Sequence, residues 1–234
     1  MDRAQFAAWS HVLYFGVLLP ILVFRLHRKF AGNKKALPDR KKHFRGATIE
    51  LSYHAGLSLL VASVTRVDLF AFDASHLARG LAVGAAFYIA AVLYMRPRWR
   101  RAVESRAPIV SLYMPRDGSE RAWWIAVSIL AGVGEEITWR GVQTQLLVPI
   151  VGTYAVAALL SALSFGGAHF VQGWKSVLVI VVFALGLQTI VWASGGLYVA
   201  MLAHVAYDVT AGLMYGKLGR ELGYAIEPGS ASTR

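Results

Sequence analysis

The stretch VLVIVVFALGLQTIVWAS, at positions 177–194, decides the fold class. It carries no charged side chain from one end to the other, and Lys175 stands just before it. A helix that crosses the roughly 30 Å hydrocarbon layer of a membrane needs about 20 predominantly apolar residues. The stretch therefore predicts a membrane-spanning helix.

Six more apolar runs of the same kind lie outward from this stretch. Short segments with charged or turn-forming residues separate them. The predicted spans are Ala7–Phe24, Ala47–Val64, Leu77–Tyr94, Trp123–Arg140, Thr153–Phe170, Val177–Ser194 and Leu197–Tyr215. The pattern predicts an all-α, polytopic transmembrane helical bundle of about seven spans. A re-entrant or interfacial helix around Gln143–Val151 would change that number.

The composition excludes an ordinary soluble domain. Of the 234 residues, 56% are hydrophobic and only 16% are charged, whereas a soluble domain typically has about 25% charged residues. The apolar runs are too closely spaced to leave room for a separate soluble module. We expect a single integral membrane domain over 1–234, with a motif-bearing core at about 119–216 and a short cytoplasmic tail at 217–234.

The formal net charge of +11 indicates membrane orientation rather than nucleic-acid binding. Lys and Arg gather in short loops, chiefly 25–45 and 96–106, which two predicted spans separate. Such basic loops normally face the cytoplasm. The N-terminus is then predicted outside, in the inner membrane of a bacterial cell, and the partner implied is the lipid bilayer and not a nucleic acid. The absence of cysteine excludes disulfides, thiolate metal ligands and a cysteine nucleophile.

Charged side chains inside predicted spans are costly and usually face a bundle interior or a water-filled cavity. The first cluster is GVGEEITWRG, at positions 132–141. Its i,i+4 spacing lets Glu136 and Arg140 pair along one helix face. Glu135 is left without that partner, and an unpaired carboxylate in an apolar site can take a proton from water as a general base. A buried ion-pair network without chemistry is the alternative.

Two further clusters place imidazoles in later spans. FGGAH, at 165–169, has small residues that permit close helix approach beside His169. HVAYD, at 204–208, puts His204 and Asp208 on one helix face. Each also has a purely structural interpretation: His169 as an interfacial residue, and His204–Asp208 as a structural hydrogen bond.

Helix rise predicts the depth of these side chains in the membrane. At 1.5 Å per residue, Glu135 lies about 18 Å from the inner face, and His204 lies at about the same depth. His169, counted from Thr153 at the outer face, falls about 12 Å too low to meet them. Contact would then require that its helix starts late or kinks near Gly166 and Gly167.

The order Glu-Glu-x-x-x-Arg, Phe-x-x-x-His and His-x-x-x-Asn/Asp on successive predicted spans resembles the CAAX protease and bacteriocin-processing family, which includes the type II CAAX prenyl endopeptidases. The resemblance covers Glu135 to Asp208. It implies an intramembrane endopeptidase in which Glu135, helped by His169, activates water. His204 and the residue at position 208 would stabilise the oxyanion, and Glu136 and Arg140 would order the site.

One position departs from the family pattern. The prenyl proteases characteristically have Asn where this chain has Asp208, and a carboxyl group can donate a hydrogen bond only when protonated. The alternative is that Asp208 orients His204 or helps to bind a metal.

The residue types leave a metal open. A site made of Glu135, His169, His204 and Asp208 could hold zinc with an open position for water, yet the His-Glu-x-x-His signature of a metalloprotease is absent. A cofactor other than zinc is not implied.

The implied substrate is a membrane-anchored or lipidated peptide, and nothing in the sequence says whether it is prenylated. A noncatalytic membrane scaffold or bacteriocin-immunity protein of the same family is the main alternative. An ion-coupled transporter is a third, although no inverted repeats are visible.

Overall fold

The computed structural model describes residues 1–30, 39–106 and 108–224. Within these ranges every regular element is a helix and none is a strand. The predicted all-α helical bundle is therefore confirmed. Part of the basic loop 25–45 and the end of the predicted tail, residues 225–234, lie outside the described residues.

The helices follow the order of the predicted spans. They are α1 (Arg3–Leu13), the π-helix η1 (Tyr14–Leu18), α2 (Leu19–Phe30), α3 (Arg40–Thr65), α4 (Ala74–Glu104), the 3-10 helix η2 (Pro108–Tyr113), α5 (Gly118–Glu135), the π-helix η3 (Glu136–Gln143), α6 (Thr144–Val151), α7 (Tyr154–Ala168), the 3-10 helix η4 (Phe170–Gln172), α8 (Trp174–Ser194) and α9 (Tyr198–Glu221). The last of these continues five residues, 217–221, into the segment that the sequence predicted to be the tail.

Among the described residues, four helical stretches are long and apolar enough to cross a membrane by length and composition. They are Arg3–Arg28, Arg40–Thr65, Ala74–Glu104 and Trp174–Ser194, and α7 is a shorter apolar helix. The remaining stretches, α5 and α9, carry the charged residues of two motifs, which lowers their hydropathy.

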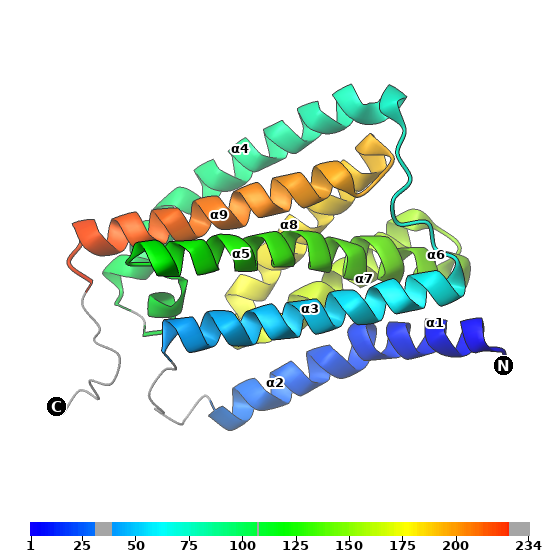
Figure 1. The fold of residues 1–234 in the computed structure, drawn as a ribbon, viewed down its shortest axis with the longest axis horizontal. Helices are drawn as coiled ribbons and strands as arrows, with labels where there is room; N and C mark the ends of the chain where they lie inside the picture. The colour runs from blue at the N-terminus through cyan, green and yellow to red at the C-terminus, as the bar shows by residue number, and fades with distance from the viewer. Residues whose placement is uncertain (31–38, 107, 225–234) are drawn as a thin grey trace.

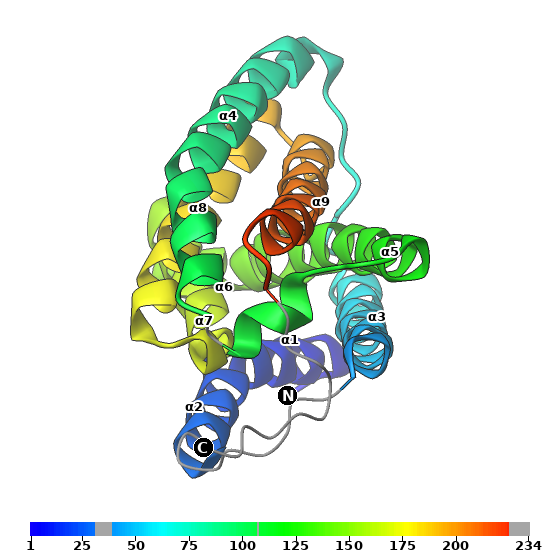
Figure 2. The same cartoon turned by 90° about the vertical axis from the view of Figure 1, so that its left-hand side faces the viewer.

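Most helices run along the long axis of the molecule (Figure 1). The end view shows α5 between α3 and α9, with α4 beside α8 and α9 (Figure 2). The N-terminal stretch α1–η1–α2 packs against α3 and α7. The motif-bearing helices α5, α7 and α9 are thus enclosed by neighbours.

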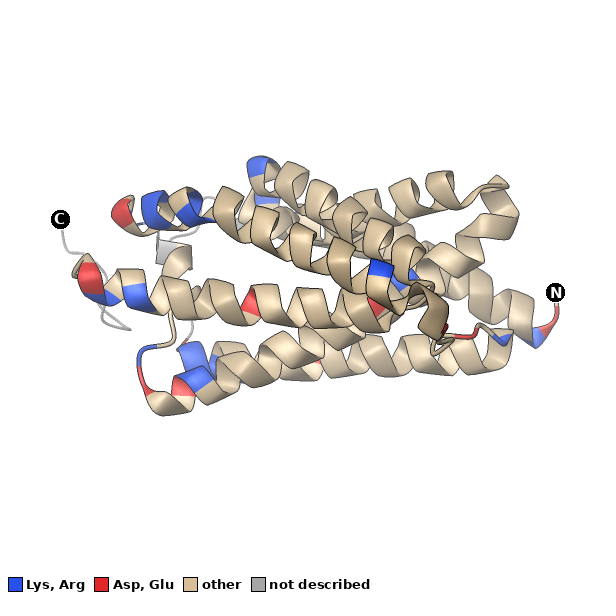
Figure 3. Cartoon of the chain, turned by 90° about the horizontal axis from the view of Figure 1, so that it is seen from above, with Lys and Arg blue, Asp and Glu red and all other residues tan. Residues whose placement is uncertain are grey.

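Polarity is arranged for a membrane rather than for water. Large apolar side chains cover the outside, among them Val182, Trp192 and Leu60, which are 69%, 66% and 62% exposed. The interior holds polar groups, and Glu136 and Thr138 are fully buried. Lys and Arg gather mainly at one end of the bundle, the end at which α9 finishes (Figure 3). The chain is an integral membrane protein.

The fourth predicted span ends too early at Arg140. Helical backbone continues from α5 through η3 and α6 to Val151, and the chain then turns back at Gly152, whose positive φ of 79° suits glycine. Glu135 and His169 stand the same number of residues before and after Gly152. The two side chains are therefore at the same level, and the predicted depth mismatch of His169 is wrong because α7 descends from the tip of this longer hairpin.

Candidate active site

Glycines around the paired glutamates bring two helices close to them. A Cβ at position 132 would lie 2.7 Å from the Val205 backbone nitrogen, and one at position 134 would lie 3.1 Å from the Ala55 Cβ. Only a glycine lets α9 approach α5 at this point, and Val205 directly follows His204. Gly132 therefore fixes His204 beside the glutamates.

The helix changes type at the glutamates themselves. Glu135 ends α5, and Glu136 begins the π-helix η3, whose eight residues are all buried. Short π-helical segments within α-helices occur frequently at functional sites. The wider turn directs the side chains of the two neighbouring glutamates to different partners.

Glu136 is the most enclosed acid of the site. Its Oε1 accepts a hydrogen bond from His204 Nδ1 at 2.8 Å and lies 3.1 Å from Arg140 Nη1. Arg140 is also buried, and its guanidinium carbon lies 4.4 Å from the centre of the Phe165 ring. Such a paired, cation–π-supported arrangement holds the charge in place. Glu136 and Arg140 thus form a fixed frame for His204.

Both imidazoles turn the same nitrogen toward Glu135. His169 Nδ1 donates to the Phe165 carbonyl at 2.8 Å, and His204 Nδ1 donates to Glu136. Because a carbonyl oxygen can only accept, the Nδ1 of His169 carries the proton. The Nε2 atoms of His169 and His204 then lie 4.0 and 3.8 Å from the Glu135 carboxylate.

Asp208 joins this group from α9. Its Oδ2 lies 3.6 Å from His204 Nε2, and its backbone carbonyl accepts a hydrogen bond from Trp124 Nε1 at 2.9 Å. The structure thus brings together all four residues that the sequence singled out: Glu135, His169, His204 and Asp208. The Glu136–Arg140 pair contacts this group through the hydrogen bond between Glu136 and His204.

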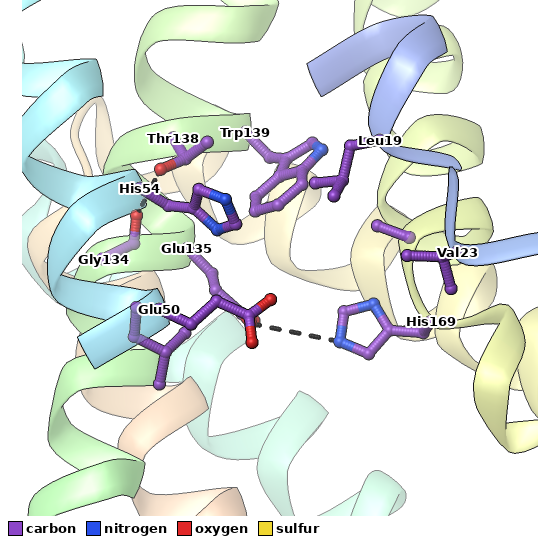
Figure 4. Close-up of a pocket in the computed structure, with 11 residues that line it drawn as sticks. Leu19, Val23, Glu50, His54, Gly134, Glu135, Thr138, Trp139 and His169 are labelled. Carbon is purple, nitrogen blue, oxygen red and sulfur yellow. Dashed lines mark hydrogen bonds and ion pairs between the residues drawn. The ribbon is translucent and has the colours of Figure 1, made fainter. Parts of the chain in front are cut away.

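His169 reaches the site through the two glycines that precede it. A Cβ at position 166 would lie 2.5 Å from a Val181 methyl on α8, and one at position 167 would lie 3.0 Å from the Pro20 Cβ on α2. The end of α7 is therefore packed tightly on both sides. His169 caps this helix end and projects toward Glu135 (Figure 4).

A small cavity opens at Glu135. Its volume is about 80 Å³, and its walls come from α2, α3, α5, η3 and the end of α7 (Figure 4). A polar cavity of only about 10–15 Å³ on this measure admits one water molecule. The cavity can therefore hold water beside the carboxylate. The Glu135 carboxylate lies about 4 Å from each imidazole Nε2, too far for a direct hydrogen bond.

Two cavity residues were not singled out from the sequence. Glu50 and His54, one turn apart on α3, line the same cavity as Glu135 and His169. His54 Nε2 lies 3.3 Å from the Tyr14 hydroxyl. Both lie inside the predicted span Ala47–Val64, so the rule that polar side chains within spans are functional candidates would have found them.

Within the described ranges, no three His, Asp or Glu side chains are placed to hold a metal ion together. The nitrogens that face Glu135 are nevertheless of the type that zinc binds. Any metal would have to be held by these same side chains after they move closer together.

Comparison with known proteins gives one result. Residues 118–210 match the family described as "Type II CAAX prenyl endopeptidase Rce1-like". No curated protein and no solved structure matches the chain. The matched segment begins with α5 and includes all three motifs, and it supports the family predicted from the motifs.

Proposed function

Because the motif-bearing segment belongs to the Rce1-like family of type II CAAX prenyl endopeptidases, we propose that this protein is an intramembrane endopeptidase that uses Glu135 to activate water. The substrate would be a peptide anchored in or attached to the membrane. The observation that carries the proposal is the position of the Glu135 carboxylate. It lies between two imidazole Nε2 atoms, at the edge of a cavity large enough to hold water.

The geometry supports a general-base mechanism. Glu135 takes a proton from a water molecule in the cavity while the water oxygen attacks the peptide carbonyl carbon. His169 faces the same carboxylate and would hold the water in line. The tetrahedral intermediate collapses with cleavage of the C–N bond, and the proton passes from Glu135 to the leaving amine.

His204 and Asp208 face the other side of Glu135. A polar hydrogen on either side chain could stabilise the negative oxygen of the intermediate, a contribution typically worth 100-fold or more in rate. Glu136 keeps His204 in orientation through Nδ1, so that only Nε2 faces the reaction. The frame of Glu136 and Arg140 would therefore act on catalysis through His204.

The site lies inside a bundle whose outer surface is apolar, which favours a substrate that is itself at the membrane. Prenylated and unprenylated forms of the same membrane-anchored peptide would show whether the lipid is recognised. A faster reaction with the prenylated form would extend the family's described substrate to this chain.

The test is peptide cleavage by purified protein in lipid, with wild type compared with Glu135→Gln and His169→Ala. We expect both changes to reduce cleavage at least 100-fold, because each removes a group that acts on the attacking water. Glu221→Ala changes an exposed carboxylate remote from the cavity and should cleave like wild type. A chelator arm decides whether a metal takes part.

The contrary outcome is equally clear. Wild type that cleaves neither the prenylated nor the unprenylated peptide, or a Glu135→Gln protein that cleaves normally, contradicts the peptidase proposal. A noncatalytic scaffold would then be the better interpretation of the same fold.

A further inference from the structure

We infer that Glu50 of α3 selects peptides that carry a basic side chain next to the scissile bond. The inference rests on the proposed peptidase function and adds a specificity residue to it. Glu50 lies outside the segment that matches the family, in a span without any of the three motifs.

The first observation is the position of Glu50. It lines the cavity that Glu135 and His169 border, and α3 supplies this wall together with His54 and Leu51. Figure 4 shows Glu50 and Glu135 on one side of the cavity and His169 on the other. A peptide that reaches the Glu135 carboxylate would therefore pass close to the Glu50 carboxylate.

The second observation is the charge of the cavity wall. Among the described residues that line it are two carboxylates and no Lys or Arg. Arg140, the cation of the site, lies behind it against Glu136 and the Phe165 ring. Within the described part of the chain, no Lys or Arg forms an ion pair with Glu50, and the imidazoles near enough to interact with its charge are those of His43 and His54.

The third observation is depth. Glu50 stands five residues beyond Arg45, about 7 Å further along the helix axis, on a helix that is otherwise long and apolar enough to span the membrane. Its side chain is exposed rather than packed. A carboxylate at this depth is unfavourable unless water or a cation reaches it. A Lys or Arg of the substrate would provide that cation and gain an ion pair in return.

The ligand chemistry follows from these three observations. A Lys or Arg on the peptide is attracted to Glu50, a neutral residue is tolerated, and an acidic residue is repelled by both Glu50 and Glu135. Charge complementarity of this kind sets specificity as much as affinity, because a like-charge contact excludes the wrong partner.

The experiment uses matched peptides that differ only in having Lys, Gln or Glu on either side of the cleaved bond. For wild type, kcat/KM should be about ten-fold higher with Lys than with Gln, and lower still with Glu. Glu50→Gln should bring the Lys-to-Gln ratio within about two-fold. Glu50→Lys should invert it, so that the Glu peptide becomes the preferred substrate.

Glu104→Gln and Glu104→Lys are the matched controls, because they make the same charge changes at an exposed carboxylate at the end of α4. Their Lys-to-Gln ratios should equal that of wild type. Each ratio is taken within one variant, so a general loss of active protein cancels.

Two failures are distinguishable. If wild type cleaves none of the peptides, the proposed function fails. If wild type cleaves the Lys and Gln peptides equally well and Glu50→Lys leaves that ranking unchanged, the peptidase function stands and the selection by Glu50 is overturned.

Discussion

Asp208 is the residue at which this chain departs from the family pattern, and its contacts bear on the role of the carboxyl group there. His204 already has a firm partner, because Glu136 accepts from its Nδ1 at 2.8 Å. The contact of Asp208 with His204 Nε2 is longer, at 3.6 Å. A carboxylate at position 208 is therefore not needed to orient the imidazole, and we propose that Asp208 in its protonated form donates a hydrogen bond to the oxyanion.

This assignment predicts a difference between two substitutions. Asp208→Asn keeps the shape of the side chain and supplies an amide donor, so it should retain cleavage within about ten-fold of wild type. Asp208→Ala removes the polar group and should lose at least 100-fold, or about 2.7 kcal/mol of transition-state stabilisation. Initial rates with one membrane-anchored peptide are the measurement. Equal loss in both variants would show that the carboxylate itself is required.

At the residue scale, sequence patterns predict the parts of the site that depend on spacing along one helix. The approach of Glu136 to Arg140 and of His204 to Asp208 follows from i,i+4 geometry. The partner of Glu136 across the bundle, His204 Nδ1, could not be predicted, because it depends on the rotation of α9 about its own axis. The position of Glu50 in the cavity wall could not be predicted either, because it depends on the packing of α3 against α5.

Among the elements, the N-terminal helix α1 is connected to the π-helix η3 by a series of buried polar side chains. His11 on α1 lies 3.0 Å from Gln143 Oε1 through Nδ1 and 3.1 Å from Ser58 Oγ through Nε2. Ser58 donates to Thr138 Oγ1, and Thr138 donates to the Gly134 carbonyl next to Glu135. These hydrogen bonds therefore join α1 and α3 to η3 beside the candidate active site.

Aromatic packing also connects the N-terminal stretch to η3, through η1, which continues α1. Phe15 is fully buried, and its ring lies 5.3 Å from that of Trp139 on η3 and 5.2 Å from the imidazole of His54 on α3. The N-terminal helix, although it precedes the family-matched segment, is thus part of the wall that holds η3 in place.

His11→Ala tests this connection. It removes the partner of Gln143 Oε1 and one of the two partners of Ser58 Oγ in the interior, and we expect the free energy of unfolding to fall by about 1–2 kcal/mol. Denaturant unfolding in mixed micelles measures the change. His76→Ala removes an imidazole whose side chain is 43% exposed and should change stability by less than about 0.5 kcal/mol. Equal stability of His11→Ala and wild type would mean that the buried polar chain contributes nothing to the fold.

Element boundaries were predicted well where a run is uniformly apolar and poorly where the motifs interrupt it. The run at 177–194 falls entirely within α8. The span predicted to end at Arg140 continues to Val151, because a π-helix absorbs the charged residues without ending the helix. This longer helix also explains why His169 meets Glu135 although a count from Thr153 placed it too low.

For the whole molecule, the distribution of charge relates the bundle to its membrane. Exposed apolar side chains cover the outside, and the basic residues gather mainly at the end where α9 finishes (Figure 3). α4 joins the two ends: Asp73 caps its start, and Arg98, Arg100 and Arg101 lie in its last two turns. Its 31 residues extend over about 46 Å, more than the roughly 30 Å of a hydrocarbon core.

The complete absence of cysteine makes this orientation directly measurable, since any introduced thiol is unique. Ser75 and Ser105 are exposed at opposite ends of α4. In intact bacterial cells that express the protein, we expect a membrane-impermeant maleimide to label Ser75→Cys. Ser105→Cys, next to the arginines, should be labelled only after permeabilisation, because basic loops are retained in the cytoplasm.

The result also decides from which side a peptide could reach the cavity. Glu50 lies in the half of α3 nearer its basic start, so a cytoplasmic basic end places the Glu50 wall closer to the cytoplasmic face than to the outer one. Substrates with a basic residue on the cytoplasmic side of their anchor would then meet Glu50 before Glu135. Labelling of Ser105→Cys in intact cells would show that the basic end faces outward. The same selection by charge would then act on peptides that arrive from outside.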